Sequence, residues 1–83
     1  MIVRTIKTTV GEAEEIIADR LRHIYRSDKE LFRKGDVIEF LVIKDRKRIP
    51  HKIDNASYVI TSVENSLTAP VLKRYQIIGF REL

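Results

Sequence analysis

The apolar run VIEFLVIK within residues 36–44 is the feature that most restricts how this chain can fold. Only Glu39 interrupts it, so the alternation of a half-exposed strand is lost and both faces of the strand should be covered. The 83 residues have room for one domain, 1–83, with one core. A chain this short has to cover such a strand with its own strands, as a barrel or a sandwich does.

One helix is predicted near the N-terminus. Thr9 and Glu12 form a capping-box pattern, in which the two side chains bond each other's backbone. Apolar residues then recur at three- and four-residue steps: Ala13, Ile16, Ile17, Leu21 and Ile24. Arg20, Arg22 and His23 fall towards the C-terminal end of this stripe, where the helix dipole favours positive charge. The pattern therefore predicts a helix that continues to about Ile24.

The rest of the chain is rich in strand patterns. Strands are predicted at 2–7, 36–44, 48–53, 57–64 and in the terminal run 71–83. Gly35 is expected to supply a turn before the apolar strand, and Gly79 a bulge or bend inside the last one. Pro50 marks 48–53 as an edge or bulged strand. The fold class is therefore α+β, mainly β: a small mixed β-barrel of about five to six strands with the N-terminal helix packed on it.

Composition excludes several classes of protein. Because there is no cysteine, neither a disulfide framework nor a thiolate metal site is available, and His23 and His51 lack the spacing of zinc ligands. The longest apolar run without a charge, FLVI, is four residues, too short for a membrane-spanning helix. The N-terminal residues show no export signal, so a cytoplasmic location is expected. No cofactor, metal or membrane partner is predicted.

Positive charge is concentrated in two segments. The net charge is +4, and residues 44–52 hold five Lys or Arg against one acid, while residues 20–34 hold six against two. Residues 11–19 are acidic instead. Such segregation is typical of a polyanion-binding surface, but acids at a helix N-terminus followed by solvated loops produce the same pattern. The sequence leaves both interpretations open.

Cations beside aromatic residues favour RNA among the polyanions, because cations hold phosphates while tyrosine stacks on unpaired bases. Tyr25 and Arg26 are such neighbours, although on a strand they would point to opposite faces. Phe32 and Phe80 are expected in the core. The candidate nucleic-acid-binding residues form two groups: Arg22, Tyr25, Arg26, Lys29 and Arg33, and then Lys47, Arg48 and Lys52.

No catalytic motif is present. The chain has no G-x-S-x-G, no cysteine nucleophile and no glycine-rich phosphate loop. The sequence therefore does not predict an enzyme.

The segment RLRHIYRSDKELFRKGDVIEFLVI, with the closing YQIIGF run, resembles the ASCH-like branch of the PUA superfamily, and within it a bacterial and phage group of uncharacterised domains. Phe32, Gly35 and Asp36 match the F-x-x-G-D turn of that group, and Arg26 matches its arginine. The resemblance implies a β-barrel with a cleft between barrel and helix, in which relatives are proposed to bind RNA and a few hydrolyse a modified nucleoside.

The chain departs from the ASCH signature G-x-K-x-x-E-x-R. With the arginine on Arg26, Asp19 stands at the glycine, Leu21 at the lysine and Ile24 at the glutamate. The lysine proposed as catalytic in hydrolytic relatives therefore has no counterpart, which argues against the hydrolase activity that the resemblance would otherwise allow.

The sequence thus predicts an RNA-binding domain centred on Arg26, which can fork two hydrogen bonds to a phosphate or stack on a base. The same arginine can instead hold its loop in place by pairing with Asp28 or Asp36. An interaction module that pairs with another protein through the edge strand near Pro50 is the alternative function. A nucleoside-modifying amidohydrolase is the third.

Overall fold

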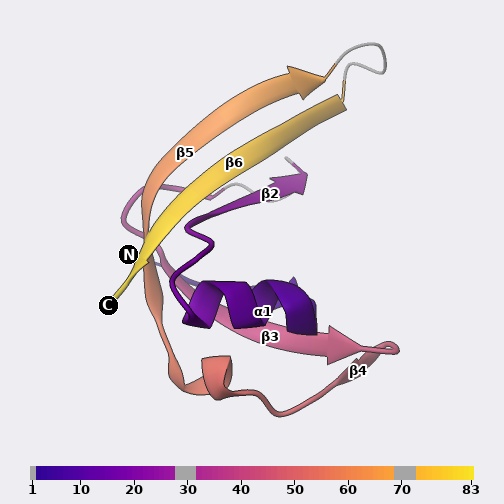
Figure 1. Cartoon of the computed structure of the whole chain (residues 1–83). Coiled ribbons are helices and arrows are strands. Elements are labelled where there is room, and N and C mark those ends of the chain that lie inside the picture. The colour runs from indigo at the N-terminus through magenta and orange to yellow at the C-terminus, as the bar shows by residue number, and fades with distance from the viewer. Residues whose placement is uncertain (1, 28–31, 69–72) are drawn as a thin grey trace.

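The structure, a computed structural model, describes residues 2–27, 32–68 and 73–83, with the backbone alone at 66–68, 73 and 74. Its elements are β1 (Val3–Thr8), α1 (Val10–Ile17), β2 (His23–Ser27), β3 (Val37–Lys44), β4 (Lys47–Arg48), the 3-10 helix η1 (Lys52–Asn55), β5 (Tyr58–Thr68) and β6 (Lys73–Glu82). The six strands form one sheet in the order β1-β3-β5-β6-β2, and β4 pairs with β3 off this path (Figure 1). The mainly β fold with one N-terminal α-helix is confirmed.

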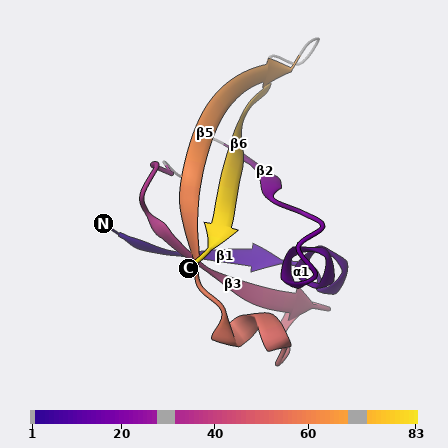
Figure 2. The same cartoon turned by 60° about the vertical axis from the view of Figure 1, so that its left-hand side comes forward.

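The sheet is open, in contrast to the closed barrel that the sequence predicts. β1 and β2 are both edge strands in the strand order. β3 and β5 share only two residue pairs, Val37 with Val59 and Ile38 with Tyr58. Because this junction is so short, the β5–β6 pair rises away from the β1–β3 pair, with α1 beside the latter (Figure 2). The chain covers its core by bending the sheet over α1, without joining the two edges by backbone pairing.

The helix is shorter than the apolar stripe suggests. The Thr9 hydroxyl accepts a hydrogen bond from the Glu12 backbone N–H, which starts α1 as predicted. The helix ends at Ile17, and Asp19 adopts a left-handed backbone with φ 61° that turns the chain away. His23 and Arg26 therefore lie in β2, which pairs with β6, and not at a helix end. Ile24 keeps its place in the core from a strand.

The β3–β4 hairpin also differs from its prediction. Asp45 and Arg46 form its two-residue turn, both with positive φ. The return strand is only Lys47–Arg48, and the chain beyond Pro50 forms η1 in place of the predicted strand 48–53. Proline cannot donate to a strand ladder, and the His51 side chain then caps η1 by accepting from the Ile53 N–H.

β5 and β6 form a long antiparallel pair that extends beyond the rest of the sheet (Figure 1). The register shifts between Ile60 and Ser62, opposite Gly79, so the bulge predicted at Gly79 lies on its partner strand. A Cβ at Gly79 would collide with Ser62 Oγ and lie 3.1 Å from His23 Nε2. β5 continues to Thr68, where the sequence predicts a loop from 65, and the rest of that loop is outside the described residues.

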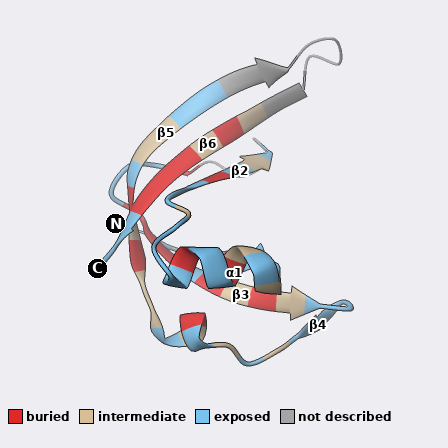
Figure 3. Ribbon diagram, in the orientation of Figure 1, coloured by how far each residue is buried: buried red, intermediate tan, exposed pale blue. Residues whose placement is uncertain are grey.

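The core lies between the two halves of the sheet and one side of α1 (Figure 3). Phe32 and Phe80 are buried as predicted, and Phe40, Tyr58 and Phe80 stack edge-on or tilted with ring centroids 5.4–5.5 Å apart. Gly35, with φ 95°, makes the expected turn before β3. The aromatic contacts hold β3, β5 and β6 together in the core.

Candidate nucleic-acid interface

Arg26 connects the two edges of the open sheet. From β2, its Nη2 donates to the backbone carbonyl of Lys7 on β1 at 3.1 Å and to Glu12 Oε1 on α1 at 2.7 Å. Its Nη1 donates to the Tyr25 carbonyl at 2.8 Å. The partner is Glu12, whereas the sequence suggested Asp28 or Asp36. Asp36 lies next to Arg4, and Asp28 lies outside the described residues.

The sequence predicts that the Glu12 carboxylate completes a capping box with the backbone of Thr9. In the structure this carboxylate accepts a hydrogen bond from Arg26 instead. Oε1 of Glu12 also accepts from the Thr8 hydroxyl at 2.5 Å. Burial acts to raise the pKa of Glu12, but the hydrogen bonds from Arg26 and Thr8 outweigh it and leave the pKa below its ordinary value of 4.5. The glutamate therefore stays charged at neutral pH, and the side chains of Arg26 and Glu12 are about a quarter exposed, at 26% and 27%.

A shallow cavity of about 410 Å³ opens beside this ion pair. Its lining comes from four elements and is formed by Lys7, Thr8, Thr9, Glu12, Arg26 and Ile43. Nε of Arg26 has no hydrogen-bond partner among the described residues. Arg26 is thus held by its own chain and still borders a space that a ligand can enter.

The β3–β4 hairpin adds exposed cations at the same end of the sheet. Thr8 pairs with Val42, so β3 continues past the end of β1 into the hairpin, and Ile43, which lines the cavity, pairs with Arg48. We define the basic end as five exposed cations: Lys7, Lys44, Arg46, Lys47 and Arg48. None of them forms an ion pair within the described part of the chain. The one acid among them is Asp45 in the turn.

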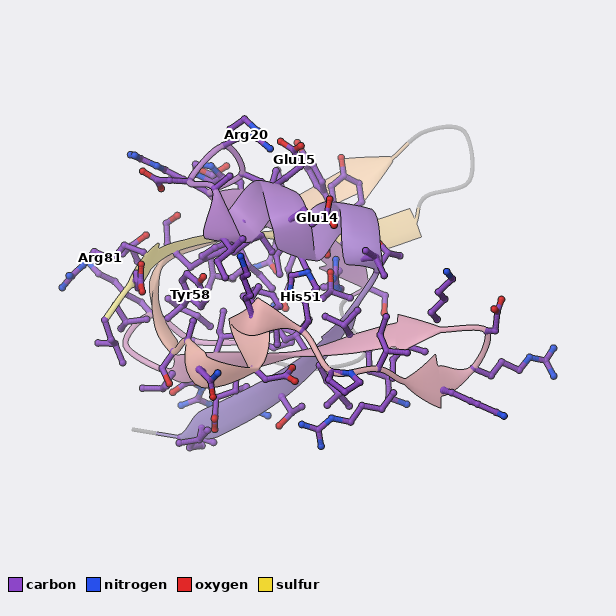
Figure 4. All side chains as sticks on the ribbon, turned by 60° about the horizontal axis from the view of Figure 1, so that its bottom comes forward. Glu14, Glu15, Arg20, His51, Tyr58 and Arg81 are labelled. Atoms are coloured by element: carbon purple, nitrogen blue, oxygen red, sulfur yellow. The ribbon has the colours of Figure 1, made fainter. Side chains whose placement is uncertain are left out.

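The formal charge of the basic end is as large as the net charge of the whole sequence. Five cations and one acid give the basic end an excess of four positive charges, which equals the +4 of the whole chain. All other charged residues balance one another. On α1 and the turn that follows, Arg20 pairs with Glu15 at 2.8 Å and Arg22 with Asp19 at 2.6 Å. Figure 4 shows Glu15 of α1 close to Arg20 of the turn that follows, and the hairpin at the opposite side of the view from Arg81.

The remaining predicted residues are spread over the molecule. Arg22 holds Asp19 through two hydrogen bonds in the exposed turn after α1. Arg33 is exposed in the turn before β3, at the opposite end of that strand from Lys47 and Arg48. Lys52 is exposed at the start of η1, and Lys29 lies outside the described residues. The structure therefore brings together Arg26, Lys47 and Arg48, and adds Lys7, Lys44 and Arg46, which the sequence did not single out.

Tyr25 points to the other face of β2. It is 62% exposed and meets Tyr75 of β6 edge-on, with ring centroids 5.7 Å apart. Arg26 and Gln76, the next pair along the same two strands, lie on the inner face. One ligand group therefore cannot contact both Tyr25 and the Arg26 guanidinium, as the alternation of a strand requires.

A larger cavity, of about 580 Å³, lies at the other end of α1 between the helix and the β5–β6 pair. Its walls are apolar at Ile16 and Phe80, and its charged rim carries both signs, including the Asp19–Arg22 pair. Burial, then Glu82 and Asp19, raise the pKa of Tyr58 in its wall. With balanced charges, this cavity offers a polyanion no net attraction.

Among the described residues, no group of three His, Asp or Glu side chains could hold a metal ion. No helix in that part of the chain is both long and apolar enough to span a membrane. No family model matches the chain, and no curated protein matches it significantly.

Proposed function

We propose that this chain binds RNA, with its phosphates along the basic end and the strand passing the cavity beside Arg26. The observation that carries the proposal is that five exposed cations, none of them in an ion pair within the described part of the chain, lie together on one end formed by β1 and the β3–β4 hairpin. When cations without carboxylate partners contact phosphates, they displace the counterions condensed on the nucleic acid. This release of counterions supplies most of the affinity.

Three features favour RNA over duplex DNA as the polyanion. The cavity is shallow and small, so it fits the backbone of a flexible single strand. No helix is exposed on the basic end to enter a major groove, since α1 is eight residues long and packs against β3 and η1. The hairpin tip is narrow and can follow a bent or looped strand, as proteins that recognise RNA loops do.

The assignment to the ASCH-like branch is part of this proposal. It is supported by the turn at Phe32, Gly35 and Asp36, where Phe32 is buried and Gly35 has the positive φ that the F-x-x-G-D pattern needs. The alternative of a protein-interaction module gains no support at Pro50, because the strand predicted there is replaced by η1.

The proposal is tested by two double variants that remove equal charge. Lys47→Ala with Arg48→Ala removes two cations from the basic end, and Arg33→Ala with Lys34→Ala removes two exposed cations from the far end of β3. Binding of a fluorescent single-stranded RNA is measured by anisotropy at 100 mM salt. Since each lost phosphate contact weakens binding several-fold, we expect the first variant to lose about tenfold or more in affinity and the second less than about threefold.

Equal losses in the two variants would mean that only net charge matters, and the basic end would not be the site. No RNA binding by the wild-type chain would refute the proposed function altogether.

A further inference from the structure

A row of polar side chains crosses the inner face of the sheet at the border of the core. Asn65 of β5 pairs with Gln76 of β6, and Gln76 pairs with Arg26 of β2. The neighbouring inner row, Val63, Ile78 and Ile24, is apolar. The inner face thus changes from apolar to polar in one step along three strands, and it does so beside the cavity that Arg26 lines.

Gln76 occupies a core position without satisfying its polar atoms. It is 3% exposed, its Nε2 donates to Asn65 Oδ1 at a long 3.4 Å, and its Oε1 is buried with no hydrogen-bond partner among the described residues. A buried acceptor without a partner destabilises the fold, and a leucine of similar shape would avoid this cost. The one bond that holds the amide is long, and Gln76 lies directly opposite Arg26, whose side chain lines the cavity.

The charge of the row indicates what it can bind. Arg26 is neutralised by Glu12, and the amides of Asn65 and Gln76 carry no charge, so a phosphate gains little here. An amide presents one donor and one acceptor side by side, the pattern found on the edge of a nucleobase. The Nε–H of Arg26 adds a further donor.

We infer that Gln76 and Asn65 form a subsite that hydrogen-bonds an unpaired base, while the phosphates on either side of that base lie on the basic end. The subsite rests on the proposed function, because it is reached only by an RNA strand that the cations hold in place. Gln76 Oε1 accepts an N–H from the base, and the free donor of Asn65 or Arg26 meets an acceptor on the same edge.

The test compares RNA with a polyanion that has no bases. The full chain and its Gln76→Leu variant are titrated with oligoadenylate, oligocytidylate, oligouridylate and inorganic polyphosphate at one salt concentration. We expect Gln76→Leu to weaken binding of the preferred homopolymer about tenfold and to leave polyphosphate binding unchanged, because only the base contact is lost. Asn55→Ala removes an exposed amide at the end of η1 and serves as the control, with no change for any ligand.

Folding and binding are separated by two further measurements. Thermal unfolding of Gln76→Leu should occur at or above the wild-type temperature, since the variant loses an unpaired acceptor and keeps its volume. In the wild-type chain, the side-chain NH₂ resonances of Gln76 and Asn65 should shift on addition of the preferred homopolymer but not on addition of polyphosphate.

Equal affinities of wild type and Gln76→Leu for every homopolymer would overturn the subsite and leave the proposed function standing. Unchanged Gln76 and Asn65 resonances would overturn it as well. If the wild-type chain bound neither RNA nor polyphosphate, the proposed function and the subsite would fail together.

Discussion

Arg26 is the residue for which the structure adds most to the prediction from the sequence. Sequence reasoning left open whether its guanidinium holds a ligand or fixes the chain. In the structure three hydrogen bonds tie it to β1, α1 and its own strand, while it still borders the cavity. Its partner Glu12 could not be identified from the sequence, because the capping-box pattern assigned that carboxylate to the backbone at Thr9.

Replacing Arg26 should destabilise the fold. Arg26→Ala removes the side-chain link between the two edge strands and leaves the partly buried Glu12 carboxylate without its cation. The free energy of unfolding from urea titration should fall by about 1–2 kcal/mol, below the full value of a buried charged hydrogen bond because both groups are partly exposed.

Arg22→Ala is the matched control for that measurement. It breaks an ion pair of similar geometry that is fully solvated, and stability should stay nearly unchanged. A wild-type stability for Arg26→Ala would show that its contacts do not hold the edges together.

The Glu12 carboxylate should make stability depend on pH. Its pKa is lower in the folded chain than its ordinary value of 4.5, so its stabilising effect is complete above about pH 5.5 and is lost as the pH falls through the folded pKa. Glu12→Gln should therefore be less stable than wild type at pH 7, and the difference should shrink as the pH falls below 4.5, as followed by thermal melts. A constant difference between the two across this range would contradict the lowered pKa.

At the scale of elements, β1 and β3 are predicted well, whereas the end of the helix, β2 and the strand at 48–53 are not. β1 and β3 lie within one residue of their predicted ranges because β-branched runs and the Gly35 turn mark them locally. Leu21 and Ile24 continue the helical spacing by coincidence. Ile24 lies in a strand because HIYRS alternates and β6 is available to pair with it, and such a tertiary contact leaves no local signal.

The β3–β4 turn provides a test in which stability and binding change in opposite directions. Arg46 has φ 65°, a left-handed conformation that glycine adopts without cost. Arg46→Gly should stabilise the fold by up to about 1 kcal/mol in urea titrations, since the relief of strain exceeds the added chain entropy.

The same variant should weaken RNA binding several-fold, because one cation of the basic end is lost. RNA affinity that stayed the same, or rose along with stability, would mean that the hairpin serves the fold alone.

For the molecule as a whole, the sequence could supply the charge total but not its location. The basic segment at 44–52 was visible in the sequence. The structure places Lys44 to Arg48 together in the hairpin, beside Lys7 from a distant part of the chain. That neighbourhood arises from parallel pairing of β1 with β3 across the α1 crossover. Gln76 gave a usable signal that was overlooked, since it is a polar residue in phase with the buried Ile78 and Phe80.

Whether the sheet closes into a barrel could not be predicted from the sequence either. The strand patterns show that both faces of the sheet must be covered, but they do not show whether the two edge strands pair with each other. In this chain α1 lies between β1 and β2, and a side chain replaces the ladder of backbone hydrogen bonds that would close a barrel.

The salt dependence of RNA binding tests the central claim most directly. The association constant of the wild-type chain for a single-stranded RNA is measured between 50 and 300 mM KCl, and its logarithm is plotted against the logarithm of the salt concentration. Five cations on the basic end predict a slope of up to about −3.5, and Lys47→Ala with Arg48→Ala should reduce its magnitude by about 1.4. A slope near zero, or one that the double variant leaves unchanged, would contradict the assignment of the basic end as the RNA-binding surface.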